Sequence, residues 1–210
     1  MKIIEPSFIV MDNIQDLNIL KKIEQAGRTC YKSEDKITSE SAVKFCKSII
    51  KSGHHSVLEH SSVSVLIVCD RGVSHEIVRH RIASYSQEST RYCNYSKDKF
   101  GNELTFIKPF FWNDDEVAYG LWKVACETSE RVYLQLIDHG SMAQEARSVL
   151  PNSLKTEIVC TFNIREWRHF FTLRCSPKAH PQMREIAIPI LNKFKEIMPV
   201  LFEDIEYGNV

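Results

Sequence analysis

The densest group of side chains able to do chemistry lies between positions 76 and 91 of the 210-residue chain. Its polar members are Glu76, Arg79, His80, Arg81, Ser84, Ser86, Gln87, Glu88, Ser89, Thr90 and Arg91. Guanidinium forks and hydroxyl groups are the donors that proteins use to hold phosphates and carboxylates. The cluster therefore indicates an anion-binding site. The alternative is a solvated charged helix followed by a polar loop, which is the usual disposition of exposed charge.

The first half of this cluster is expected to lie on a helix over residues 72–82, because apolar residues recur there at helical spacing. Residues two apart on a helix point in different directions, so Arg79 and Arg81 would not face one ligand. Glu76 would instead share a helix face with Arg79 and with His80.

The second half is expected to be extended if the chain unwinds near Ala83. Alternate residues of an extended segment point the same way, so Ser89 and Arg91 would share one direction. They would then offer a hydroxyl and a guanidinium to one phosphate.

The bulk composition limits the classes of protein that fit. Hydrophobic residues make up 43% and charged residues 26%, as in an ordinary globular protein. Lysine plus arginine equals aspartate plus glutamate, 27 of each, so the formal net charge is zero. A protein that binds polymeric nucleic acid would normally carry a clear positive excess. The balance argues against such a partner and leaves a local basic site open.

The cysteines and the chain start indicate a cytoplasmic protein. The seven cysteines are odd in number and far apart, so no CxxC zinc or redox pair exists. The first ten residues hold too short an apolar run for a signal peptide. No stretch approaches the ~20 apolar residues of a membrane span. Reduced thiols in the cytoplasm are therefore expected.

The glycines exclude two common ways of binding a nucleotide. The seven glycines are widely separated, so GxGxxG and GxxxxGK[ST] are both absent. If the protein binds a nucleotide, arginines, hydroxyls and helix N-termini must hold the phosphates.

Hydrophobic spacing predicts alternating strands and helices and therefore an α/β fold. Strands are expected at residues 2–11, 62–69, 104–107 and 155–162. Helices are expected at residues 14–26, 39–51, 72–82, 142–150 and 165–173, and from Pro181 to a break or kink at Pro189. Gly27 is expected to stop the first helix, and Ser56-x-x-Glu59 resembles a capping box at a short helix start. Neither a repeat nor a linker interrupts the chain, so residues 1–210 are predicted to be one domain.

A long helix is expected between Asn113, as its N-cap, and Gly140, which ends it. The acidic residues 114–116 suit the positive end of the helix dipole. Its core face is predicted to consist of Val117, Leu121, Val124, Thr128, Val132 and Leu136.

Four motifs follow one another along most of the chain and resemble those of flavin-dependent thymidylate synthases. They are Arg79-His80-Arg81 followed after seven residues by Ser89, GHxSxxEH at 53–60, ARxxLP at 146–151, and TxNxR at 161–165 with its closing LR at 173–174. One arginine motif would be weak evidence, whereas four in the family's order are specific.

The resemblance implies a reaction, a fold and an assembly. Members of the family convert dUMP to dTMP with methylenetetrahydrofolate as carbon donor and FADH2, regenerated by NADPH, as hydride donor. They have a mixed, mostly antiparallel sheet packed with helices, and they form homotetramers in which the sites are shared between subunits.

The same resemblance assigns the substrate residues. Ser89, Arg91 and Arg147 are expected to hold the dUMP phosphate, which suits forks and hydroxyls. Arg174 is the expected catalytic residue, stabilising negative charge that develops on the N3/O4 edge of the uracil. Further dUMP-binding residues are expected to be Glu76, Arg79 and Gln87.

FAD is expected to be held by a second set: Ser56, Arg79, His80, Arg81, Gln87, Asn163, Arg165 and His169. Arg165 and His169 are four apart and therefore share a helix face. Many relatives carry asparagine where this chain has His169, and both side chains can hydrogen-bond a flavin. His54 could stack near the flavin or cap a turn.

Two features complete this picture. None of the seven cysteines follows a proline, as the nucleophile of the cysteine-dependent thymidylate synthases does, so all seven are expected to be buried or semi-buried small hydrophobes. Position 76 is Glu where relatives often have Gln, and Glu88 follows Gln87 where others read Glu then an aliphatic residue. A carboxylate beside the dUMP phosphate would repel it, so direct roles for Glu76 and Glu88 are in doubt.

Two competing functions are weaker. An RNA- or DNA-binding module would use the arginines and tyrosines, but no basic stripe exists. A zinc hydrolase would use the histidines at 54, 55, 60, 75 and 80, but no HExxH or finger spacing occurs. No metal site is therefore expected.

Overall fold

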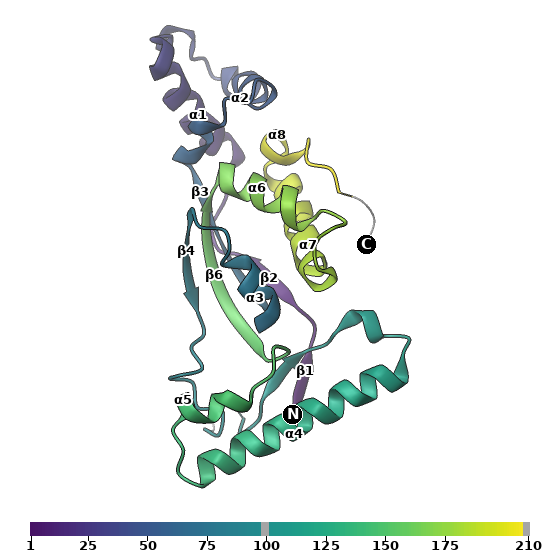
Figure 1. The fold of residues 1–210 in the computed structure, drawn as a ribbon. Helices are drawn as coiled ribbons and strands as arrows, with labels where there is room; N and C mark the ends of the chain where they lie inside the picture. Colours follow the sequence, from purple (N-terminus) through teal and green to yellow (C-terminus); the bar gives the residue numbers. More distant parts are fainter. Residues whose placement is uncertain (98–100, 208–210) are drawn as a thin grey trace. The chain divides into compact units, whose positions relative to one another are not determined.

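The computed structural model describes residues 1–97 and 101–207, and it combines helices and strands throughout (Figure 1). The strands are β1 (Lys2–Ile4), β2 (Ser7–Val10), β3 (Ser62–Asp70), β4 (Ala83–Gln87), β5 (Thr105–Ile107) and β6 (Lys155–Asn163). The α-helices are α1 (Asp16–Tyr31), α2 (Ser41–Lys51), α3 (Arg71–Ile77), α4 (Glu116–Asp138), α5 (Ala143–Ala146), α6 (Ile164–Arg174), α7 (Pro181–Ile197) and α8 (Pro199–Phe202). Short 3-10 turns occur at η1 (Glu34–Lys36), η2 (His55–His60), η4 (Phe110–Trp112) and η5 (Arg147–Val149). The expected mixture of helices and strands is confirmed. The polar stretch at 92–102 is predicted from its sequence to be a loop, and part of it lies outside the described residues.

The strands form two sheets. The larger has the order β2-β3-β6-β4, and the smaller pairs β1 with β5 in parallel. β3 and β6 run antiparallel, because the Ile164 amide donates to the Ser61 carbonyl at one end while the Arg71 amide donates to the Leu154 carbonyl at the other. The antiparallel character expected for the main sheet is thus confirmed.

The chain separates into two compact units. The first contains residues 1–7, 67–79 and 86–158, and the second contains residues 8–66, 80–85 and the chain from 159 onward. The boundaries fall inside β2, β3, β4 and β6, and between Arg79 and His80.

Each unit has its own apolar core. The first unit buries a cluster made of Tyr95, Leu104, Phe106, Trp122, Cys126, Tyr133, Ala146 and Leu154. The second buries a set of aromatic rings on α6, α7 and α8, with Trp167 at the centre: its ring lies 4.4 Å from Phe162 and 5.1 Å from Phe194, centroid to centroid. Alternating burial along β3 and β6 supplies the sheet side of these cores.

The face predicted for the long helix was wrong over its first half, although Leu136, near its end, does pack against the core. Val117, Leu121 and Val124 are 74%, 69% and 59% exposed in the described chain, and α4 buries Trp122 and Tyr133 instead. Both stripes have a helical period, so periodicity could not choose between them. The two rings are also tied to the first unit, because Trp122 Nε1 donates to Ser153 Oγ and Tyr133 Oη accepts from the Tyr95 amide.

Several element ends differ from the sequence-based prediction. The first expected strand is two strands, with Pro6 between them, because proline cannot donate to a ladder. The helix expected to reach residue 82 ends at Ile77. The N-cap of α4 is Asp115, whose carboxylate accepts from the Ala118 amide. The expected capping box at Ser56-x-x-Glu59 does not form, although the short helical turn is present.

One helix continues past a predicted stop, and another runs through the proline at which a break or kink was predicted. α7 runs through Pro189, because its buried face, which includes Ile190, holds it against the core. α1 runs through Gly27, whose lack of a side chain leaves room for a neighbouring ring: a Cβ there would lie 2.5 Å from Cζ of Phe45. The left-handed residue that ends α1 is Lys32.

Within the two described stretches of the chain, none of the helices has the length and apolar character of a membrane-spanning segment.

Alanine at Gly27 and at Gly120 is expected to have different effects on stability. Gly120 lies within α4 with no atom within 4 Å of its missing Cβ, so Gly120→Ala should raise the free energy of unfolding by up to about 1 kcal/mol. Gly27→Ala gains the same helix propensity but must displace the Phe45 ring, over which Arg28 packs at 4.8 Å. Urea unfolding should therefore show no gain, or a loss, for Gly27→Ala. Equal gains at the two positions would contradict the tight α1–α2 contact.

Candidate functional site

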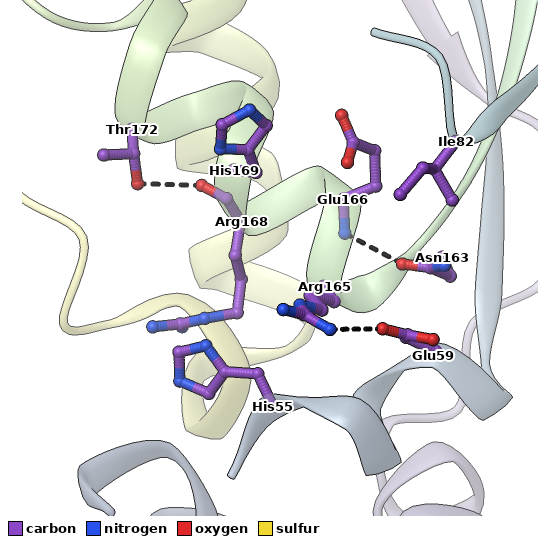
Figure 2. Close-up of a pocket in the computed structure, with 9 residues that line it drawn as sticks. All are labelled: His55, Glu59, Ile82, Asn163, Arg165, Glu166, Arg168, His169 and Thr172. Atoms are coloured by element: carbon purple, nitrogen blue, oxygen red, sulfur yellow. Dashed lines mark hydrogen bonds and ion pairs between the residues drawn. The ribbon is translucent and has the colours of Figure 1, made fainter. Parts of the chain in front are cut away.

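A pocket of about 530 Å³ in the second unit lies against α6 (Figure 2). Its lining residues are His55, Glu59, Ile82, Asn163, Arg165, Glu166, Arg168, His169 and Thr172. Arg165, His169 and Thr172 lie on successive turns of α6 and thus on one face of the helix. Three of the residues expected at FAD therefore meet in one pocket: Asn163, Arg165 and His169.

A second pocket of about 320 Å³ adjoins the first, because Arg165 and His55 line both. Ser56 and His54 also line it, together with Gly53. This places another residue expected at FAD, Ser56, beside Arg165.

Two motifs are joined at this site by an ion pair. Arg165 Nη1 donates to Oε1 of Glu59, so the TxNxR and GHxSxxEH segments are held together (Figure 2). Asn163 is also the N-cap of α6, since its Oδ1 accepts from the Glu166 amide at 2.8 Å. The cap fixes the start of the helix that carries the pocket residues.

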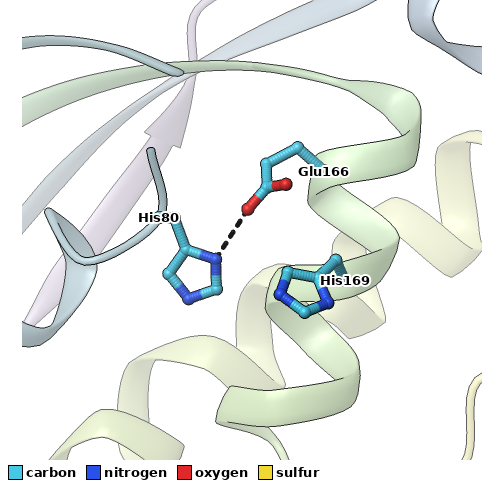
Figure 3. A group of neighbouring side chains, drawn as sticks. All are labelled: His80, Glu166 and His169. Carbon is cyan, nitrogen blue, oxygen red and sulfur yellow. Dashed lines mark hydrogen bonds and ion pairs between the residues drawn. The ribbon is translucent and has the colours of Figure 1, made fainter. Parts of the chain in front are cut away.

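Arg79 and Arg81 are both exposed, whereas His80 between them is only 4% exposed. His80 Nδ1 lies 2.8 Å from Oε1 of the buried Glu166 (Figure 3). Arg174 Nε donates to His80 Nε2 at 3.1 Å. The tripeptide thus presents two cations to the surface and one imidazole to the interior.

His80, Glu166 and His169 have possible ligand atoms within 4.8 Å of one another, as a metal site would require (Figure 3). A cation there would meet the guanidinium of Arg174, which already donates to His80 Nε2. The other ring nitrogen of His80 is shared with Glu166. The contacts therefore favour a hydrogen-bonded network over metal ligation.

The residues expected at the dUMP phosphate lie in the first unit. Arg147 lines a pocket of about 270 Å³ together with Thr90, Arg71 and His75, and its Nη1 donates to Thr90 Oγ1 at 3.4 Å. Arg91 is exposed. Arg71 and His75 were not expected from the sequence, and only their position near the arginine cluster could have suggested them.

Ser89 and Arg91 do not form the extended pair that was expected. β4 ends at Gln87, and Ser89 begins a turn in which its carbonyl accepts from the amides of Tyr92 and Cys93. Its hydroxyl accepts from the Arg91 amide at 3.3 Å. A serine that bonds its own following backbone favours turns over strands, which is why alternation failed here.

Two neighbours of this turn are held by the protein itself. Gln87 Nε2 donates to Ser74 Oγ at 2.9 Å and to Thr156 Oγ1 at 3.1 Å. Glu88 accepts from Lys155 Nζ at 3.0 Å and from Tyr95 Oη at 2.9 Å. The Glu88 carboxylate is therefore neutralised within the first unit and does not oppose an anion as an isolated charge.

The cysteines provide no activated thiolate among the groups with a perturbed pKa. Burial raises the pKa of Cys46, Cys126, Cys160 and Cys175 to about 12. Such thiols stay protonated and unreactive at neutral pH. Five of the seven cysteines are buried; Cys30 is exposed and Cys93 is partly buried.

The sequence-based prediction missed Glu166, which is the most consequential of the unexpected residues. Its signal lies in the spacing of Glu166, Phe170 and Arg174, which are four apart and form one stripe of α6. All three contact His80: the two charged side chains by hydrogen bonds, and Phe170 with its ring centroid 5.0 Å away.

Known proteins resemble this chain over most of its length. Residues 14–200 match the family described as thymidylate synthase complementing protein (Thy1). A flavin-dependent thymidylate synthase of Geobacter sulfurreducens is 37% identical over 85% of this chain and 78% of the relative. Enzymes of the same name from Mycolicibacterium gilvum, 37% identical over 88% and 78%, and Pyrococcus furiosus, 35% identical over 83% and 72%, are similar too. With this match running through both units and all four motifs, the chain belongs to the thymidylate synthase complementing protein family.

Proposed function

We propose that this protein is a flavin-dependent thymidylate synthase that converts dUMP to dTMP. Methylenetetrahydrofolate would supply the carbon, and FADH2, regenerated by NADPH, would supply the hydride. The observation that carries the proposal is the match of residues 14–200 to the family, together with relatives of this name over most of the chain.

The residues around α6 fit a flavin nucleotide. Ser56, Asn163, Arg165 and His169 bring a hydroxyl, an amide, a guanidinium and an imidazole to two adjoining pockets. Guanidinium and hydroxyl donors can hold the diphosphate of such a cofactor. They would replace the glycine-rich phosphate loop, which the chain lacks. The proposed cofactor residues are completed by Arg79, Arg81 and Gln87, whereas His80, expected at FAD from the sequence, is buried and has both ring nitrogens hydrogen-bonded within the protein. The bound flavin would supply the hydride that turns the transferred carbon unit into a methyl group.

The residues of the first unit fit the nucleotide substrate. Ser89, Arg91 and Arg147 would hold the phosphate of dUMP, since each offers a hydroxyl or a guanidinium near the surface. The amide nitrogen of Gln87 is held by Ser74 and Thr156, so its amide oxygen would be the atom presented to the substrate. Glu76 and Arg79 complete the proposed substrate set.

Arg174 is the proposed catalytic residue. Its guanidinium is partly buried at the end of α6, and its Nε is fixed by His80. A positioned cation at the N3/O4 edge of uracil would stabilise negative charge there and make C5 electron-rich. This activation needs no protein nucleophile, in agreement with the raised pKa of the buried thiols.

The proposal extends to the assembly. Residues 1–210 would act as one catalytic domain in a cytoplasmic homotetramer whose sites are shared between subunits, without a polymeric nucleic acid or a membrane as partner. The exposed row Val117, Leu121 and Val124 on α4 supports an oligomer, because a surface helix rarely leaves three large apolar residues of one stripe in water.

The purified protein is expected to be yellow and to release FAD on denaturation. It should form dTMP from dUMP only when methylenetetrahydrofolate and NADPH are both present, and it should rescue a thymidine-requiring host. Absorbance near the flavin band and chromatography of the nucleotide product measure these outcomes. A colourless protein that neither binds added FAD nor rescues the host would contradict the proposal.

Arg174→Ala is expected to retain FAD and to lose about 10²- to 10³-fold in kcat, the usual effect of removing one positioned charge-stabilising donor. The Michaelis constant for dUMP should change much less, because the interaction strengthens only as charge develops. Lys44→Ala, which removes an exposed cation from α2, is the control. Turnover like that of the wild type in Arg174→Ala would remove this residue from the mechanism.

A further inference from the structure

We propose that His80 and Glu166 are positioning residues that orient the guanidinium of Arg174, and that His80 serves the site by this hydrogen-bonded chain instead of using its ring nitrogens on the flavin. This inference deepens the proposed function and rests on it. In the Arg79-His80-Arg81 tripeptide, the two arginines would then contact the ligand, and the histidine between them would position Arg174.

The donor and acceptor roles along this chain follow from chemistry. A guanidinium only donates, so His80 Nε2, 3.1 Å from Arg174 Nε, must accept with its lone pair. The proton of the neutral ring then sits on Nδ1 and is donated to the Glu166 carboxylate at 2.8 Å. Glu166 therefore selects the one tautomer of His80 that can hold Arg174.

The imidazole is held firmly enough to act as a template. Phe162 stacks on it at 6.1 Å between centroids, and Phe170 lies at 5.0 Å in an edge-to-face arrangement. The hydroxyl of Tyr85 donates to the His80 carbonyl at 2.6 Å, which anchors the backbone as well. Since His80 is only 4% exposed, the ring cannot turn without breaking several contacts.

Helix α6 supplies both end members of the hydrogen-bonded chain, Glu166 and Arg174. Glu166 and Arg174 lie eight residues apart on one stripe, with Phe170 between them, so a single ring can bridge them across two turns. The Asn163 cap fixes the amide of Glu166 and so the register of this stripe. Arg174 has a long and flexible side chain and is the last residue of the helix. Its orientation therefore depends most on the hydrogen bond that holds it.

The electrostatics favour a neutral ring. Burial lowers the pKa of His80; the hydrogen bond with Glu166 opposes this, and the charge of Arg174 lowers it further. The titratable groups that face the ring are Glu166, His169 and Arg174 from α6, while the Tyr85 hydroxyl of β4 donates to the backbone carbonyl of His80. A protonated ring would place an N–H against Arg174 Nε, and the bond that orients the guanidinium would be lost.

A double-mutant cycle tests the coupling. His80→Ala in the holoenzyme is expected to keep FAD and to lower kcat by about 10- to 100-fold, as loss of a supporting hydrogen bond commonly does. In an Arg174→Ala background, His80→Ala should add less than about 2-fold, because the two residues act through one group. Losses that multiply, or loss of FAD in His80→Ala, would overturn the proposal.

A comparison of two Glu166 variants provides a second test if His80→Ala does not fold. Glu166→Gln keeps an oxygen that accepts from Nδ1–H and should stay within about 3-fold of wild-type kcat, whereas Glu166→Ala should fall by about 10-fold or more. Glu196→Gln, at an exposed carboxylate of α7, is the control. Equal kcat for the two Glu166 variants would refute the positioning role. A wild-type enzyme that makes no dTMP would instead refute the proposed function.

The lowered pKa of His80 also predicts how stability depends on pH. The unfolded chain binds this proton below pH ~6.5 while the folded protein resists it, so the stabilising contribution is complete above that value and is lost as the pH falls through the folded pKa. Urea unfolding of wild type and His80→Gln between pH 7.5 and pH 5 should show the larger decline for wild type. A wild type that gains stability toward pH 5 relative to this variant would indicate a charged His80–Glu166 pair and contradict the neutral chain.

Discussion

The rotational register of α6 is the constraint on which the second unit depends. One face of this helix buries Trp167, Phe170 and Phe171, and Trp167 Nε1 donates to the Val63 carbonyl of β3 at 3.0 Å. With those rings fixed, Arg165, His169 and Thr172 must line the pocket. A rotation of the helix by one residue would bury charge and expose rings, which is why packing and site geometry cannot be changed separately.

Burial and function are divided between the units in different ways. In the first unit, polar side chains such as Gln87 and Glu88 are held by hydrogen bonds and ion pairs near the expected phosphate residues. In the second, the decisive polar groups are interior: His80 and Glu166 are buried, and both have a partner. Buried polar groups without partners would be costly, so the hydrogen bonds are a condition of the fold as much as of the chemistry.

The sequence predicted the strands at β3 and β6 and the helix at α6 well, because alternation and helical spacing there match their burial. It could not predict which stripe of α4 is buried, since Val117, Leu121 and Val124 repeat as regularly as Trp122 and Cys126. The choice depends on what the rest of the chain places against the helix.

The candidate site shows the same division. The motifs identified the surface residues, among them Arg165 and Ser56, and the structure brings these to adjoining pockets. Glu166 escaped notice because its partner His80 lies 86 positions earlier, and a contact of that range leaves no local pattern. The turn at Ser89 was missed for the opposite reason, because a very local hydrogen bond overrode the expected extension.

The burial pattern of residues 79–81 gives the spacing of the motif a meaning of its own. Exposed, buried, exposed is a short stretch in which one inward side chain forces its two neighbours outward. Inserting or deleting a single residue before His80 would leave the composition almost intact but would turn an arginine toward Glu166 and the imidazole toward solvent. The spacing of the tripeptide therefore fixes side-chain directions: burial of His80 orients the backbone, and this orientation turns Arg79 and Arg81 toward solvent.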